Sequence, residues 1–303
     1  MAVSELFMHR KMHGTPIYHD DKVWFDYVSG DMRFCIISNT ESMHLTLAGV
    51  SALSTFYYGA DGYFYFRGDI ASEGLTSKLI KMNADGGRHY YAALSPTNCI
   101  SSALAPGDGH VYFLTDGNKL MYVDPSAPPA AAEDYESVEC ATTPVVPPMG
   151  PAESMFYSEP DGMIRRIGLA RNGKTPGAAI QVCDKKTTEP LLACADGYLY
   201  FTVDKTLYRF ALTDSESTTP TNTLVLNHKV VGGLKAFDSG FDKRIYYLAD
   251  DGFLYSVTVD PWQATAPTTA LCNTKMGSVP VPGPPGLLFC RGADDMLYKI
   301  PTT

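Results

Sequence analysis

The feature that most constrains this chain is a pattern that recurs seven times along it. Each copy has an aromatic-rich segment, a turn containing Asp or Gly, and a second segment that usually begins with Leu-Tyr or an equivalent pair. The second segments begin at residues 33, 79, 120, 164, 207, 254 and 297, in steps with a mean of 44 residues. A repeat of this length indicates units that bury their faces against one another.

Aromatic content, alternation and turn residues indicate that the repeated segments are strands, and no stretch shows sustained helical periodicity. One four-stranded antiparallel blade takes about 40 to 45 residues. We therefore predict an all-β, seven-bladed β-propeller, with residues 1–303 forming a single domain. The first strands of the seven hairpins are Val23–Tyr27, Tyr63–Phe66, Val111–Leu114, Met155–Tyr157, Tyr198–Phe201, Ile245–Leu248 and Leu287–Phe289.

Each repeat has room for two further strands. Segments with Asp or Asn at matching positions predict outer strands, and segments rich in small residues and Pro predict innermost strands, where the blades converge. The predicted outer strands are Gln181–Lys186, Leu224–Lys229 and Ala270–Lys275. The predicted innermost strands are Ile100–Ala105, Pro190–Ala195 and Gly277–Pro282.

The seventh hairpin ends at Ile300, so the last blade needs an outer strand from elsewhere in the chain. Residues 3–10 are the available donor, with Thr15–His19 as the innermost strand of the first blade. This pairing would close the ring without a free strand edge. We predict that an N-terminal strand completes the last blade.

The pattern Asp-Gly-x-Leu/Phe-Tyr-Phe is seen at Asp61–Phe66 and Asp196–Phe201, and the partner strands that follow are Leu79–Met82 and Leu207–Phe210. It resembles repeats of lipoprotein-receptor propellers. That resemblance implies a binding platform, although the chain lacks the Tyr-Trp-Thr-Asp tetrapeptide of that class. Propeller lectins, which stack a sugar on Trp between blades, are a second comparison. The chain has only two Trp residues, Trp24 and Trp262, so Tyr would have to replace them.

Charge and apolar content exclude several classes of partner. The formal charge is −9 and the pI about 5.2, which opposes binding to phosphate backbones, so no nucleic-acid partner is expected. The start lacks the apolar stretch of a secretory signal, and no apolar run reaches the length that a bilayer requires. We expect a soluble protein, cytoplasmic or non-classically secreted, without a membrane partner.

Seven cysteines without a CxxC motif predict buried, reduced thiols.

The turn that joins the two strands of each hairpin carries an acid in all seven repeats. One interpretation is an acidic rim that attracts a metal ion or a basic partner. The other is that Asp is favoured in turns, where it bonds its own backbone and tolerates unusual dihedral angles. The residues are Asp31, Asp69, Asp116, Asp161, Asp204, Asp250, Asp251, Asp294 and Asp295.

Eight residues are candidates for ligand binding. Histidines at the ends of innermost strands could move protons or ligate a metal, and tyrosine pairs could form stacking platforms. A Trp on the loop after the sixth hairpin could be an exposed anchor for a partner. For each of them a structural role is the alternative. The candidates are His13, His19, Tyr57, Tyr58, Tyr90, Tyr91, His228 and Trp262.

Two functions remain open at this point. The first is a binding module for a carbohydrate or a protein, which needs no catalytic group. The second is a lyase or hydrolase in which a divalent cation, held near the axis, polarises the substrate. No HExxH, GxSxG, phosphate-binding Gly loop or EF-hand loop is present. No catalytic or metal-ligating residue is assigned, and the binding module is the leading hypothesis.

Overall fold

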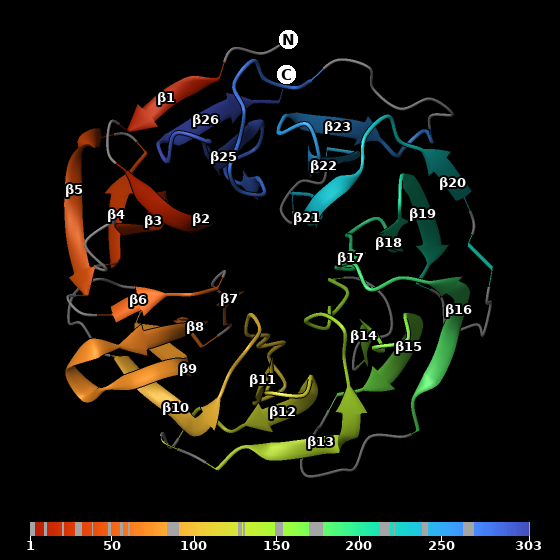
Figure 1. Ribbon diagram of the computed structural model, residues 1–303, viewed down its shortest axis with the longest axis horizontal. Helices are drawn as coiled ribbons and strands as arrows, with labels where there is room; N and C mark the ends of the chain where they lie inside the picture. Colours follow the sequence, from red (N-terminus) through yellow and green to blue (C-terminus); the bar gives the residue numbers. More distant parts are fainter. Residues whose placement is uncertain are drawn as a thin grey trace.

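The seven repeats form a ring of antiparallel sheets, as Figure 1 shows for the computed structural model viewed down the ring axis. The prediction of a seven-bladed, all-β propeller is confirmed. The structure describes residues 4–8, 11–19, 21–27, 32–37, 39–47, 50–54, 57–59, 61–83, 91–126, 129, 131–148, 154–169, 178–212, 219–220, 222–237, 242–262 and 270–302. Within these residues, no helix is long and apolar enough to cross a membrane.

Strands run outward from the axis within each blade, and we label their positions a (innermost) to d (outermost). Blade 1 contains β2 (Met12–His19), β3 (Lys22–Tyr27), β4 (Met32–Ile36) and β5 (Asn39–Leu47). Blade 2 contains β6 (Val50–Ala52), β7 (Tyr57–Tyr58), β8 (Tyr63–Ile70), β9 (Leu75–Asn83) and β10 (Tyr91–Asn98). Blade 3 contains β11 (Val111–Leu114), β12 (Lys119–Val123) and β13 (Glu133–Glu139). A short 3-10 helix, η1 (Ala71–Glu73), joins β8 to β9.

The other four blades follow in chain order. Blade 4 contains β14 (Ser154–Ser158), β15 (Met163–Gly168) and β16 (Ile180–Lys186), and blade 5 contains β17 (Leu192–Ala193), β18 (Tyr198–Val203), β19 (Thr206–Ala211) and β20 (Asn222–Val225). Blade 6 contains β21 (Val230–Lys235), β22 (Arg244–Ala249) and β23 (Leu254–Thr258). Blade 7 contains β24 (Val281–Pro282), β25 (Leu287–Arg291), β26 (Leu297–Pro301) and β1 (Glu5–Met8).

Antiparallel order gives the ring two distinct faces. The turns between b and c strands, and the connections from each d strand to the next a strand, lie on one side, which we call the b–c face. The turns between a and b strands and the c-to-d connections lie on the opposite side, the a–b face. Because strands alternate in direction, a residue's place in its strand decides which face it reaches.

The core lies between neighbouring sheets. The b strands carry the largest buried side chains, and β11 is buried along its whole length. A strand covered on both faces reads as a continuous apolar run rather than an alternating one, which explains the aromatic-rich segments of the repeat. One cluster joins Tyr200 of blade 5 to Tyr247 of blade 6, and another joins Phe289 of blade 7 to Val23 of blade 1.

The predicted N-terminal closure is confirmed. β1 pairs antiparallel with β26, with Glu5 opposite Lys299 and Leu6 opposite Tyr298. The Phe7 ring lies 5.2 Å from the Phe289 ring in an edge-to-face contact. The blue and red ends of the chain therefore meet in one blade in Figure 1.

The blades depart from four regular strands in several places. In blades 3 and 4 the innermost position is held by single bridges, Leu104–Tyr112 and Val145–Phe156. The predicted outer strand Ala270–Lys275 is not a strand; instead, the Leu271 N–H donates to the Leu254 carbonyl at 2.6 Å. Short segments rich in Pro, Gly and small residues can follow a strand without forming its full ladder.

Blade 2 carries an extension on the b–c face. Its b–c hairpin continues to Ile70 and η1, and β6 pairs with it, with Ser51 opposite Asp69. Asp69 therefore lies in β8 and not in a turn, which corrects the expectation from the sequence. Gly68 permits this pairing, because a Cβ there would collide with the Ser51 carbonyl oxygen.

We predict that the ring depends on burial of β1. Phe7→Ala should lower the free energy of unfolding by about 3 to 5 kcal/mol, because Phe7 is 5% exposed and packs on blade 7. Leu6→Ser, in the same strand but with Leu6 37% exposed, should cost much less. Urea titration followed by circular dichroism measures both. Equal stability of the two variants would contradict a closure that rests on packing of β1.

Candidate functional site

A hydrogen-bond unit of one Asp and one Tyr recurs six times and includes two of the turn acids, Asp251 and Asp294. In each unit one carboxylate oxygen accepts the backbone N–H two residues later, and the other accepts the hydroxyl of the Tyr four residues later. Asp196 shows the geometry, accepting the Tyr198 N–H at 3.1 Å and the Tyr200 hydroxyl at 2.6 Å. The six pairs are Asp61–Tyr65, Asp108–Tyr112, Asp196–Tyr200, Asp242–Tyr246, Asp251–Tyr255 and Asp294–Tyr298.

These units shift the titration of both partners. Burial, and then the hydrogen bond to the Asp251 carboxylate, raise the pKa of Tyr255 to about 12. Burial alone would raise the pKa of Asp251, but the Phe253 N–H, the Tyr255 hydroxyl and His228 together bring that pKa below its usual value. A neutral tyrosine donating to an ionised carboxylate is therefore the stable state near neutral pH. The hydrogen bonds of these carboxylates stabilise turns.

The remaining turn acids do not converge on one point. Asp161 accepts the Met163 N–H and lies 3.0 Å from the Lys186 ammonium, while Asp295 pairs with Arg291 at 2.5 Å. Asp204 and Asp295 have φ of 53° and 66°, which Asp tolerates better than most residues. Asp31 lies outside the described residues. Within the described part of the chain, no three His, Cys, Asp or Glu side chains are placed to hold a metal ion.

The structure separates the three candidate histidines. His228 lies on the b–c face in the connection from β20 to β21, with Nδ1 3.4 Å from Asp250 and Nε2 3.5 Å from Asp251. Its ring also stacks on Tyr255 at 5.0 Å. His13 is exposed at the start of β2 on the same face, whereas His19 ends that strand on the a–b face.

The candidate aromatic residues are also dispersed. Tyr58 is 42% exposed and stacks on His19, but Tyr57 is half-buried against the core clusters between blades 2 and 3 and between blades 3 and 4. Tyr91 is half-buried on the outer strand β10, and Tyr90 lies outside the described residues. Among the candidates that the structure describes, His19 and Tyr58 are in direct contact.

Trp262 is not the exposed anchor expected from its loop. It is half-buried against the core of blades 5 and 6, and the Arg209 guanidinium lies 4.7 Å from its ring. The same guanidinium lies 4.3 Å from the Tyr198 ring. A cation held between two aromatic faces joins the loop to the neighbouring blade. Trp262 therefore has a structural role.

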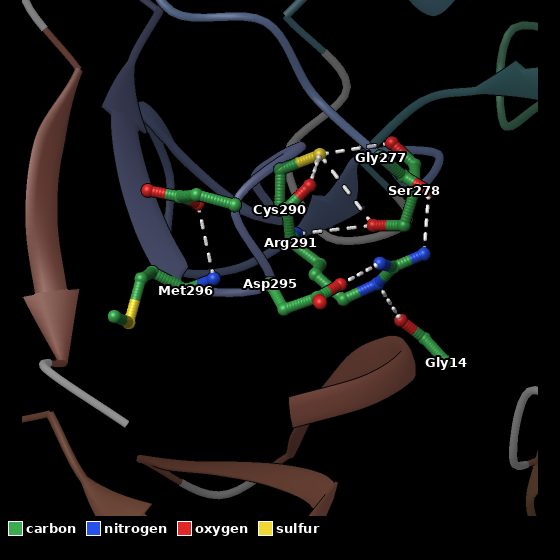
Figure 2. A network of polar contacts seen from close by, with 8 residues as sticks. Gly14, Gly277, Ser278, Cys290, Arg291, Asp295 and Met296 are labelled. Carbon is green, nitrogen blue, oxygen red and sulfur yellow. Dashed lines mark hydrogen bonds and ion pairs between the residues drawn. The ribbon is translucent and has the colours of Figure 1, made fainter. Parts of the chain in front are cut away.

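Cationic side chains that donate to carbonyls of the next blade form a set that sequence reasoning missed. Figure 2 shows one, Arg291 of blade 7, which donates to the Gly14 carbonyl of blade 1 at 2.9 Å and to the Gly277 carbonyl at 2.7 Å. The sequence does carry a signal for this set, because Arg or Lys recurs at equivalent positions of several repeats. The inter-blade donors and acceptors are Arg67 to Ile100, Lys81 to Pro125, Arg209 to Val259, Arg244 to Thr302 and Arg291 to Gly14.

On the b–c face, six of the seven blades each place one residue at an equivalent position around the axis, and four of these residues are apolar. Each residue lies in or beside the innermost segment of its blade, opposite the end of the b strand that reaches the b–c face. For example, the Leu53 N–H donates to the Arg67 carbonyl, and Val231 lies opposite Leu248. Leu53 is 40% exposed and Val231 is 43% exposed. We call this ring the axial rim. Its members are His13, Leu53, Ile100, Ala141, Val231 and Gly277.

The axial rim is the best-defined candidate for a contact surface. Leu and Val side chains that are exposed at equivalent positions of blades 2 and 6 have no role in the hydrogen-bond units described above. The extension of blade 2 rises on the same face, next in sequence to Leu53. Exposed apolar residues rimmed by polar ones are characteristic of protein-contact surfaces.

No protein-family model and no curated protein sequence matches the chain. The β-propeller domain of Cps50 (Swd1) from Myceliophteria thermophila is similar, with a TM-score of 0.68 and 11% identity over 99% of this chain and 98% of that chain. The WD40 β-propeller domain of Doa1 has a TM-score of 0.66 and 11% identity over 100% and 98%. A chain of the Mitotic Checkpoint Complex has a TM-score of 0.62 and 10% identity over 99% and 91%.

These similarities identify the fold class, a β-propeller repeat protein, and at such identities they establish the fold alone. The neighbours are WD40-like propellers. They do not support the resemblance to lipoprotein-receptor propellers that the repeat pattern suggested.

We predict that the Asp–Tyr units stabilise the blades. Tyr200→Phe should cost about 1 to 3 kcal/mol, because it leaves the Asp196 carboxylate without a buried donor. A double-mutant cycle with Asp196→Asn, measured by urea titration, should show coupling between the two positions. Tyr208→Phe is the control, since the Tyr208 ring stacks on Phe201 but its hydroxyl makes no hydrogen bond within the described residues. A cost for Tyr208→Phe equal to that of Tyr200→Phe would refute the role of the hydrogen bond.

We predict that the buried thiols are inert in the native protein. Burial raises the pKa of Cys99 to about 11 and that of Cys290 to about 12, so both remain neutral at pH 8. Because the folded-state pKa values lie above the unfolded ones, this contribution to stability is present at neutral pH and is lost as the pH rises above about 9. A thiol reagent at pH 8 should label at most one of the seven cysteines, Cys35, whose side chain is not described, until guanidinium unfolds the chain. Rapid labelling of a second native thiol would contradict this.

Proposed function

We propose that the chain is a protein-interaction scaffold that binds its partner through the axial rim of the b–c face. The observation that carries this proposal is the exposure of Leu53 and Val231 at equivalent rim positions of two blades. Apolar residues at the centre of a contact surface contribute most when a partner removes them from water. We propose that residues 1–303 form a single domain, which binds the partner as one unit.

The similar structures support this proposal at the level of the fold. One of them is a chain of a protein complex, the Mitotic Checkpoint Complex, and the match covers nearly all of both chains. A propeller positions loops and strand ends around an axis without requiring catalytic groups. This suits a scaffold whose polar side chains are committed to turns and inter-blade bonds.

The other two functions have less support. A metal-assisted lyase or hydrolase needs acids or histidines placed to hold a cation, and no three such side chains among the described residues are so placed. A lectin of the propeller type would repeat an exposed aromatic platform between blades, whereas Tyr57 and Tyr91 are half-buried and Tyr58 is the one exposed ring among the described tyrosine candidates. Protein binding requires only the exposed apolar rim.

We predict that Leu53→Asp and Val231→Asp each weaken capture of a protein partner about tenfold or more, since either change places a charge where an apolar contact is buried. The measurement is affinity capture from a lysate of the native cell, with quantitative mass spectrometry comparing each variant with the unmodified chain.

Val225→Asp is the matched control, because Val225 is 69% exposed but lies on the outer strand β20, away from the axis. Melting temperatures of the three variants show whether folding is intact. The proposal is wrong if the captured proteins are the same for both rim variants and the control, or if no protein is captured specifically.

A further inference from the structure

Tyr58 and His19 form an aromatic pair at the axial end of the a–b face. Their ring centroids lie 3.6 Å apart with an interplanar angle of 30°, and the Phe64 ring packs against both. The pair joins two neighbouring blades, since His19 ends β2 and Tyr58 ends β7, and both strands lie on the inner side of their blades in Figure 1. The protein holds the Tyr58 ring in place yet leaves the residue 42% exposed.

Elsewhere in the repeat the chain covers tyrosine rings with its own cations. The Arg209 guanidinium lies 4.3 Å from the Tyr198 ring centroid, and the Lys81 ammonium lies 3.9 Å from that of Tyr63. Within the residues that the structure describes, no Lys or Arg lies over Tyr58. Since the face of an aromatic ring attracts cations, Tyr58 offers the same kind of site to a cation from outside.

The turns beside the pair add negative charge. Asp21 lies two residues after His19, in the turn between β2 and β3, and is exposed. Asp61 follows Tyr58 with 43% of its side chain exposed, although Tyr65 and Lys81 already engage it. The chain as a whole carries a formal charge of −9. A cation on Tyr58 would bind beside the β2–β3 turn, which carries Asp21, on a molecule of net negative charge, and that charge favours its approach.

We propose that the Tyr58–His19 pair binds the guanidinium group of an arginine side chain carried by a protein partner. Guanidinium is planar and weakly hydrated, so it stacks on an aromatic ring at less cost than the strongly hydrated lysine ammonium. A neutral sugar could also stack, but it would gain nothing from the charge of Asp21. The site lies on the face opposite the axial rim, so it does not depend on the proposed function of that rim.

The test uses the full chain and small probes. N-acetylarginine methylamide, the isosteric but neutral citrulline derivative, the lysine derivative and methyl glycosides are titrated with detection by ligand-observed NMR. We expect the arginine probe to bind about two- to fivefold more tightly than the citrulline probe, and its affinity to fall as salt is added. Tyr58→Leu should abolish this preference for arginine.

Matched variants separate this site from general charge and from the axial rim. Asp21→Asn should weaken binding of the arginine probe, whereas Asp116→Asn, an exposed acid on the b–c face, should not. Leu53→Asp should leave binding of the probe intact, which keeps failure here distinct from failure of the rim. Equal affinity for citrulline, tighter binding of a glycoside or of the lysine probe, or retained preference in Tyr58→Leu would each overturn the proposal.

Discussion

Each blade of this ring buries both faces of its sheet against its two neighbours, so the pairing of β1 with β26 supports every blade and not only the seventh. Without that strand the last sheet would end in a free edge, and the contact of Phe7 with Phe289 would be lost. Inter-blade hydrogen bonds from arginines such as Arg67 and Arg291 add to this packing. They reach carbonyl groups of the next blade, which strand pairing within a blade leaves free.

The same architecture explains where function can reside. A repeat places the same acid and the same tyrosine in several blades, and pairs such as Asp196–Tyr200 use them to hold turns. The conspicuous polar residues are therefore mostly structural, and departures from the repeat are more informative. Leu53 and Val231 remain exposed at the rim of one face, and Tyr58 remains exposed at the other. The two faces can bind different groups because antiparallel strands present their opposite ends to opposite sides.

Much of the fold was predictable because strand period, turn chemistry and repeat length are local properties. The seven hairpins and the N-terminal closing strand follow from them, and the structure confirms both. The candidate site was less predictable. His19 and Tyr58 were identified singly, but their contact joins two blades that no local pattern relates. Trp262 was expected to be exposed, because a loop residue gives no sign of the Arg209 guanidinium that packs on it.

The amino-acid sequence by itself determined the number of blades, their register and the strand that closes the ring, since each depends on periodic burial along the chain. Only the tertiary structure decided which polar groups are satisfied and which side chains stay open to solvent. For His228, the tertiary structure places Asp250 3.4 Å from Nδ1 and Asp251 3.5 Å from Nε2, neighbours that its place in the repeat does not reveal. The physical reason is that exposure and hydrogen bonding depend on neighbouring blades, whose residues meet in space while lying one or more repeats apart in sequence.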